Sequence, residues 1–258
     1  MLTFEKDRLP ALQGAMSKMQ ALNMGQCVAG TFLSDIPRSL LWQVGQPGVR
    51  HSVYRSPTWS WASVDPPAGF APGIHYLGRR YEDGRSKEYA PSLSDYSSFQ
   101  MLGDLVRIPN AEQDHYGIQF CAPAVLAVLQ VTEHTEMRFD YPSYLNKHAP
   151  PMRNRYTVVR NGTSRSIVHD VEELTVAPNQ PRPTSNVLLV LVANNSRDME
   201  QVALVLRRLE TTQDYAAIGM GPQQTTYPAY ARIGILQGKD EGEENWFDGA
   251  EKQTMILF

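Results

Sequence analysis

Residues 54–65 contain the densest group of side chains that could act on a bound substrate. Tyr54, Trp59 and Trp61 lie in this stretch, which holds two of the four tryptophans of the chain. We expect residues 54–65 to be an aromatic strand segment, in which Trp59 and Trp61 share one face. Their indoles would then form a broad apolar wall whose N–H groups each need a hydrogen-bond partner. Such a wall is either core packing, which is the commoner use of buried aromatic residues, or the lining of a pocket.

A second group that could do chemistry is Asp114-His115-Tyr116. A carboxylate beside an imidazole can orient that imidazole for proton transfer. In a strand, however, neighbouring side chains face opposite sides, so Asp114 and His115 need not cooperate.

Charged side chains offer a further possibility. A basic cluster that could hold a carboxylate or a phosphate group comprises Arg153, Arg155, Arg160 and Arg165. We favour pairing between this cluster and the acidic run that follows it, which comprises Asp170, Glu172 and Glu173. Asp65 precedes two prolines and is expected to cap backbone N–H groups at a turn.

Motifs for cofactor chemistry are absent from the sequence. It has no Gly-x-Gly-x-x-Gly, no P-loop, no His-Glu-x-x-His, no Gly-x-Ser-x-Gly and no paired-cysteine motif. The six histidines are scattered without the short spacing that is typical of metal ligands. We therefore expect no cofactor and no metal.

Composition favours one globular domain over residues 1–258, because 42% of the residues are hydrophobic and 20% are charged. A net charge of −3 provides no general attraction to nucleic acids or anionic membranes. Two cysteines are too few for a disulfide framework, the N-terminal segment is charged, and no apolar run is long enough to cross a membrane. We expect a reduced, cytoplasmic protein with no nucleic-acid partner and no membrane span.

One strong helical period lies near the N-terminus. Apolar residues recur there at spacings of three and four, namely Leu9, Leu12, Met16, Met19 and Leu22. This pattern predicts an amphipathic helix over residues 7–24 that packs on the rest of the domain. A capping aspartate and an early proline predict a short helix over 35–42 that presents Leu41 and Trp42 to the core.

The pattern then becomes extended. Residues 66–114 form an irregular region rich in proline, glycine and serine, and residues 115–258 are β-rich. Short β-rich runs separated by turn residues span 117–122, 124–131, 134–139, 155–160, 166–176, 187–193, 201–208, 229–236 and 253–258. The sequence therefore predicts a mainly β fold of the α+β class, an antiparallel β-barrel or sandwich with the N-terminal amphipathic helix packed on it.

Several segments together resemble the region that follows the HET domain in fungal heterokaryon-incompatibility proteins. They are Leu2-Thr3-Phe4-Glu5-Lys6-Asp7-Arg8-Leu9-Pro10-Ala11-Leu12, Val28-Ala29-Gly30, Asp35-Ile36-Pro37-Arg38-Ser39-Leu40-Leu41-Trp42 and Tyr54 through Asp65. The closing strands of that region are resembled more loosely by Val202-Ala203-Leu204-Val205-Leu206-Arg207, Tyr230-Ala231-Arg232-Ile233-Gly234 and Glu251-Lys252-Gln253-Thr254-Met255-Ile256. The HET domain itself has no counterpart before Leu2, so the resemblance does not imply an incompatibility function.

Stand-alone chains of this appearance occur in fungal natural-product gene sets. The resemblance therefore implies a biosynthetic protein of secondary metabolism, a cofactor-independent cyclase of the pericyclase or Diels–Alderase type. Such an enzyme would shape an apolar substrate, for example a terpenoid, in an aromatic pocket. The alternative is a non-catalytic HET-associated interaction or regulatory module.

The cyclase hypothesis assigns roles to six residues. The candidate catalytic donors are Tyr54, Trp59 and His115. The candidate substrate contacts are Trp61, Tyr76 and Tyr116.

Overall fold

The computed structural model describes residues 8–22, 24–44, 48–50, 54–65, 74–76, 79–82, 85–88, 96–103, 105–107, 116–135, 153–171, 184–195, 200–209, 227–239 and 245–258. Its helices are α1 (Arg8–Ala21) and the 3-10 helices η2 (Leu33–Asp35), η3 (Arg38–Leu40) and η4 (Trp61–Ser63). The strands of the first half are β1 (Cys27–Val28), β2 (Thr31–Phe32), β3 (Trp42–Val44), β4 (Ile74–Tyr76), β5 (Arg79–Glu82), β6 (Arg85–Glu88), β7 (Gln100–Met101) and β8 (Val106–Arg107). Those of the second half are β9 (Tyr116–Thr135), β10 (Arg153–Arg160), β11 (Thr163–Ser166), β12 (Val168–His169), β13 (Thr184–Asn195), β14 (Glu200–Arg208), β15 (Ala229–Lys239) and β16 (Lys252–Leu257).

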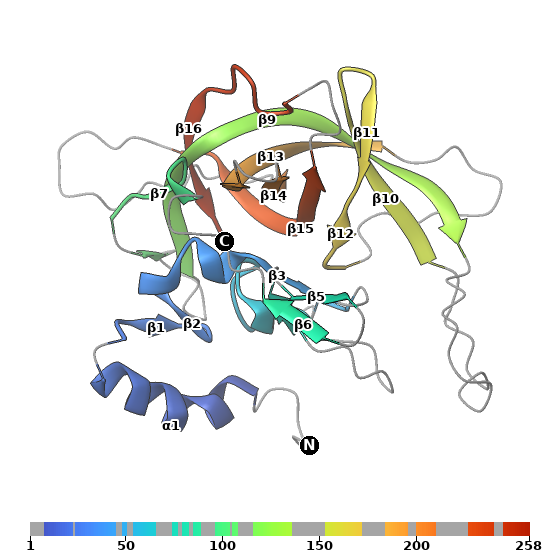
Figure 1. Cartoon of the computed structure of the whole chain (residues 1–258). Coiled ribbons are helices and arrows are strands. Elements are labelled where there is room, and N and C mark those ends of the chain that lie inside the picture. The colour runs from blue at the N-terminus through green and yellow to red at the C-terminus, as the bar shows by residue number, and fades with distance from the viewer. Residues whose placement is uncertain are drawn as a thin grey trace, which may run out of the picture.

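The largest sheet has ten strands, and its pairings close one circuit. The circuit runs through the antiparallel neighbours β9, β13, β14 and β15 and is closed by β16, which pairs parallel with β15 and antiparallel with β9. On the other side the same four shared strands form part of an open path. There β10 and β11 extend the sheet from β9 and β12 extends it from β15, and the described strands β11 and β12 do not pair with each other. The arrangement is ring-like (Figure 1), and the predicted mainly β fold is confirmed.

The strand β9 is 20 residues long and arches over the ring (Figure 1). The sequence predicts a break at Pro123, because proline has no N–H for a ladder hydrogen bond. The strand instead continues, since Pro123 pairs in register with Lys252 of β16. The next N–H, that of Ala124, donates to the carbonyl of Glu251 at 3.2 Å and restores the ladder.

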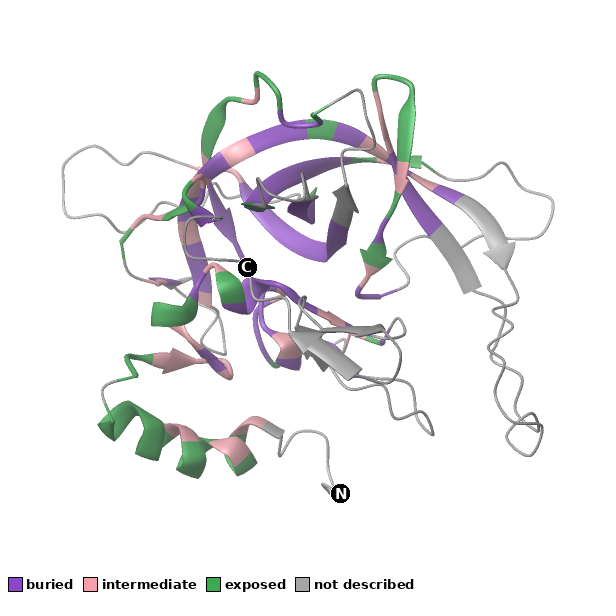
Figure 2. Ribbon diagram, in the orientation of Figure 1, coloured by how far each residue is buried: buried purple, intermediate pink, exposed green. Residues whose placement is uncertain are grey.

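Both faces of the shared strands β13 and β14 are buried. Successive side chains of a strand point to opposite faces, and consecutive residues of β13 and β14 are buried (Figure 2). One face contributes Leu188, Val190, Val192, Leu204 and Leu206 to a first core cluster. The other face contributes Val187, Leu189, Leu191, Ala203 and Val205 to a second core cluster. The continuous apolar run of β13 is explained by this two-sided burial.

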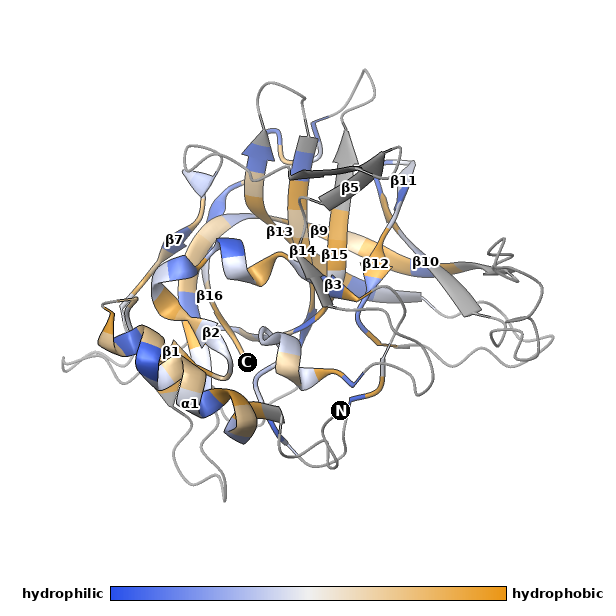
Figure 3. Ribbon diagram, turned by 60° about the horizontal axis from the view of Figure 1, so that its bottom comes forward, coloured by the Kyte–Doolittle hydropathy of each residue, from blue (hydrophilic) through white to orange (hydrophobic). Residues whose placement is uncertain are grey.

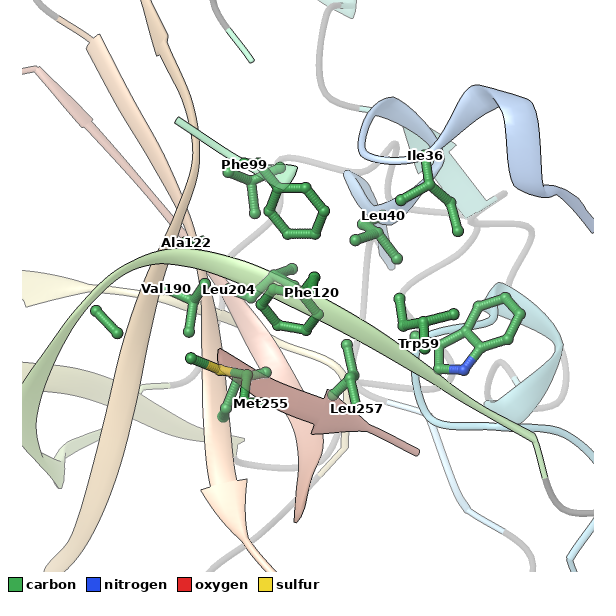
Figure 4. Packing of buried hydrophobic residues seen from close by; sticks show 14 of the residues in the cluster. Ile36, Leu40, Trp59, Phe99, Phe120, Ala122, Val190, Leu204, Met255 and Leu257 are labelled. Atoms are coloured by element: carbon green, nitrogen blue, oxygen red, sulfur yellow. The ribbon is translucent and has the colours of Figure 1, made fainter. Parts of the chain in front are cut away.

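The N-terminal segments cover the first core cluster. Leu40 of η3 and Trp59 pack beside Phe120 of β9 and Leu257 of β16 (Figure 4). Phe99 stacks on Phe120 with 4.7 Å between the ring centroids. Segments far apart in the sequence therefore share one core.

The prediction of a strand at residues 54–65 is wrong. The chain turns at Thr58 and Trp59 and forms the 3-10 helix η4, whose N-cap Ser60 accepts the N–H of Ala62 at 3.0 Å. Side chains therefore do not alternate as in a strand, and the two tryptophans separate. Trp59 joins the first core cluster, whereas Trp61 packs against a smaller cluster around Trp42.

The helix predicted over 35–42 is two separate 3-10 turns, η2 and η3. Ile36 lies between them with an extended ψ of 133°, because a residue that precedes proline is disfavoured in the α region. Leu41 and Trp42 are nevertheless buried, as the sequence predicts.

The helix α1 lies beside the β1–β2 hairpin and away from the large sheet (Figures 1 and 3). Leu9, Leu12 and Met16 are half-buried. Met19 and Leu22 continue the apolar pattern but are 44% and 76% exposed. The apolar stripe is thus covered at the first half of the helix only.

The different burial of the two tryptophans leads to a stability prediction. Trp59→Ala leaves a cavity in the first core cluster and should lower the free energy of unfolding by about 3–5 kcal/mol. Trp61→Ala should cost less, because Trp61 is only half-buried. Urea melts of both variants measure the difference, and equal midpoints would contradict the assignment.

Candidate functional site

Three of the six predicted site residues meet at the start of β9. The Tyr116 N–H donates to the Tyr54 hydroxyl at 3.3 Å, and the Trp59 indole N–H donates to the Tyr116 carbonyl at 3.4 Å. Trp59 is fully buried. The predicted donors Tyr54 and Trp59 therefore hold the backbone of β9 to residues 54–65.

Of the other three predicted residues, Trp61 makes a different contact, and the side chains of Tyr76 and His115 are outside the described residues. The Trp61 indole N–H donates to the Gly30 carbonyl at 3.0 Å. Tyr76 belongs to β4, where its backbone pairs with Trp42 of β3, and its side chain lies outside the described residues. His115 also lies outside the described residues.

A buried ion pair between Asp170 and Arg232 lies next to the aromatic residues. The Arg232 Nε donates to Asp170 Oδ2 at 2.9 Å, and its Nη2 donates to Oδ1 at 3.1 Å. Both side chains have no solvent exposure. The bidentate geometry is the one that best offsets the cost of removing both charges from water.

The Arg232 guanidinium also fastens the N-terminal segment to β15. Its Nη1 donates to the Leu40 carbonyl at 2.6 Å, and its Nη2 donates to the Trp42 carbonyl. The guanidinium carbon lies 3.6 Å from the centroid of the Trp42 ring, within cation–π range. Arg50 approaches Asp170 at 3.9 Å and donates to the Arg232 carbonyl.

The sequence does not predict this ion pair, because Asp170 is expected to pair with the basic cluster. Arg160 of that cluster donates to the Trp246 carbonyl, and Arg165 lies 4.8 Å from the Trp246 ring centroid. Asp170 instead forms its bidentate ion pair with Arg232. A single arginine inside an apolar strand segment is the signal that could have indicated a buried partner.

A groove of about 330 Å³ lies between α1 and the β1–β2 hairpin. The helix contributes side chains at spacings of three and four residues, Leu9, Pro10, Gln13, Met16, Ser17 and Gln20. The hairpin contributes Cys27, Ala29 and Gly30. This volume is within the range of small-molecule sites, and none of the lining residues that the structure describes is charged.

Gly30 lies at a close approach between the hairpin and its neighbours. Its φ is +81°, and a Cβ there would lie 3.1 Å from the Trp61 ring and 3.2 Å from Leu9. A side chain would therefore be strained and crowded at this position. Trp61, a predicted substrate contact, lies behind the groove wall and positions it through the Gly30 carbonyl.

The Cys27 thiol lies inside the groove. It donates to the Met16 thioether at 3.2 Å. Burial raises the pKa of this thiol above its ordinary value, while the backbone N–H groups of Gly30 and Thr31 oppose the shift. The thiol is therefore neutral near pH 7 and contributes a soft, weakly polar surface.

The described part of the chain contains no group of three or more His, Cys, Asp or Glu side chains that could hold a metal ion. The groove offers hydrogen-bonding groups beside its apolar contacts. Gln13 and Gln20 offer amide donors and acceptors, and Ser17, whose hydroxyl donates to the Gln13 carbonyl at 2.8 Å, retains acceptor capacity.

The ion pair leads to a second prediction. Asp170→Asn and Arg232→Met each leave a buried charge without its bidentate partner and should each cost about 3–5 kcal/mol in the free energy of unfolding. Arg55→Met, which removes the pair with Asp65 at 3.3 Å, is the control for a partly exposed pair, because the Arg55 side chain is 32% exposed and the Asp65 side chain 9% exposed; it should cost less than either of the other two variants. Urea unfolding measures all three, and similar costs would refute the special role of Arg232.

The thiol leads to a third prediction. In a Cys121→Ser variant Cys27 is the one remaining thiol. Because only the thiolate reacts, the pH at which alkylation by iodoacetamide reaches half its maximal rate should be higher in the folded protein than in urea. A midpoint that is unchanged or lower in the folded protein would show that the groove does not desolvate Cys27.

Comparison with known proteins identifies no relative of the chain. No protein-family model, no curated protein and no solved structure matches the chain. Within the described residues, no helix has the length and apolar character needed to cross a membrane.

Proposed function

We propose that this protein is a cofactor-independent cyclase that binds an apolar small molecule, such as a terpenoid, in the groove between α1 and the β1–β2 hairpin. The single observation that supports this location is a groove of about 330 Å³ whose lining, among the residues that the structure describes, carries no charge. The cyclase reaction is proposed from the resemblance to the region that follows the HET domain in fungal heterokaryon-incompatibility proteins, because stand-alone chains of this appearance occur in fungal natural-product gene sets.

The proposed binding site differs from the group of aromatic residues that the sequence predicts, which includes Trp59. Trp59 is fully buried and its N–H is bonded to the backbone of Tyr116. A substrate in contact with Trp59 would have to displace part of the first core cluster. The groove requires no such displacement, and Trp61 contributes to it by holding Gly30.

The proposed mechanism is preorganisation. Leu9, Met16 and Ala29 provide apolar surface that selects a bent conformation of the substrate. Holding two ends of one molecule in attack geometry is equivalent to effective molarities of about 10⁵–10⁸ M. An amide N–H of Gln13 or Gln20 would polarise a substrate carbonyl during ring closure.

The alternative function is that of a non-catalytic interaction module. The observation that favours it is the exposed apolar set at and beyond the end of α1, in which Met19 is 44%, Leu22 76% and Met24 47% exposed. Adjacent exposed apolar side chains of this kind are typical of protein contact surfaces.

A metabolite-turnover experiment tests the cyclase. The protein is incubated with a metabolite extract of its source organism, and mass spectrometry is used to search for an isomer of unchanged mass. Met16→Trp fills the groove and should reduce isomer formation by about 10²-fold, as expected when reacting groups are misplaced.

Met19→Trp is the matched control, because Met19 lies on the same helix but does not line the groove. It should turn over substrate like the unmodified protein. If no isomer forms with the unmodified protein, and Met19→Trp abolishes capture of a protein partner, the interaction module replaces the cyclase.

A further inference from the structure

We infer that the ligand of the groove is an uncharged chain molecule with two hydrogen-bonding groups, one held by Gln13 and the other by Gln20. This inference deepens the proposed function and rests on its assignment of the groove as the ligand site. It concerns the chemical class of the ligand and does not depend on whether the ligand is converted.

The spacing of the two glutamines defines the distance between the polar groups. Gln13 and Gln20 are seven residues apart on α1 and both line the groove. Seven residues correspond to two helical turns and a rise of about 10 Å. Two amides at this separation can each bond one end of the same ligand.

The surface between the glutamines combines apolar side chains with one hydroxyl. Met16 and Ser17 lie between them on the helix, and Cys27 and Ala29 face the groove from the hairpin. The Ser17 hydroxyl already donates to the Gln13 carbonyl. The Cys27 thiol is already bonded to Met16. The middle of the ligand should therefore be hydrocarbon, and a chain longer than about 10 Å would have to bend over Met16, which is the conformation that ring closure needs.

The described lining of the groove favours uncharged ligands. None of the nine described residues that line the groove is acidic or basic. Lys18 belongs to the same helix but is exposed and does not line the groove. A carboxylate or ammonium group placed there would lose water without gaining a counter-ion.

Protection of Cys27 from alkylation provides a direct test. In the Cys121→Ser variant, the rate at which iodoacetamide labels Cys27 is measured against rising concentrations of linear α,ω-diols of increasing length. Diols should protect saturably, with an optimum when the hydroxyl groups can span about 10 Å. The mono-alcohol of equal length should need about fivefold higher concentration, the effect of one hydrogen bond.

Three comparisons make the test decisive. Gln13→Leu and Gln20→Leu should each remove the advantage of the diol over the mono-alcohol, whereas Lys18→Leu should keep it. Linear dicarboxylates and diamines should not protect. Equal protection by diol and mono-alcohol overturns the two-anchor assignment, and equal protection by dicarboxylates overturns the requirement for a neutral ligand.

Thermal unfolding gives a second readout that does not depend on the thiol. A ligand that binds only the folded state raises Tm as its concentration rises above Kd, so the same series of compounds should rank in the same order. A missing isomer in the turnover experiment would remove the cyclase and leave this inference intact. Absence of protection and of any Tm shift with every compound would overturn it.

Discussion

The buried pair between Arg232 and Asp170 is the interaction on which the rest of the structure depends. A guanidinium and a carboxylate without solvent contact are stable only when their hydrogen-bonding groups find partners. Asp170 supplies part of these partners, and the carbonyls of Leu40 and Trp42 supply more. The N-terminal segment is therefore required to complete the hydrogen bonds of the Arg232 guanidinium. These hydrogen bonds join the two halves of the chain.

The same constraint explains the position of the aromatic residues. Trp42 stacks on the Arg232 guanidinium, and its indole N–H donates to the Trp59 carbonyl at 2.8 Å. Trp59 in turn donates to Tyr116 at the start of β9. A chain of contacts thus runs from the ion pair through both tryptophans to the large sheet. The indole N–H groups are occupied by backbone carbonyls and stabilise the joint between the segments.

The groove in which we propose ligand binding lies beside α1. Gly30 connects this groove to the aromatic joint, because the Gly30 carbonyl accepts the Trp61 N–H. The described lining of the groove is uncharged, partly apolar and partly amide. The buried ion pair stabilises the interior, whereas α1 is only half covered by the rest of the protein (Figure 2).

Local features of the sequence determined the strands. Apolar runs such as 187–193 and 201–208 match β13 and β14 closely, because strand period and turn residues are properties of neighbouring positions. Tertiary structure decided the rest. Residues 54–65 form a turn followed by the 3-10 helix η4. The strand β9 continues through Pro123, and Asp170 pairs with Arg232. Each of these outcomes depends on a partner that is distant in the chain. None of the groove residues was predicted as a site, because the groove exists only where α1 meets the hairpin.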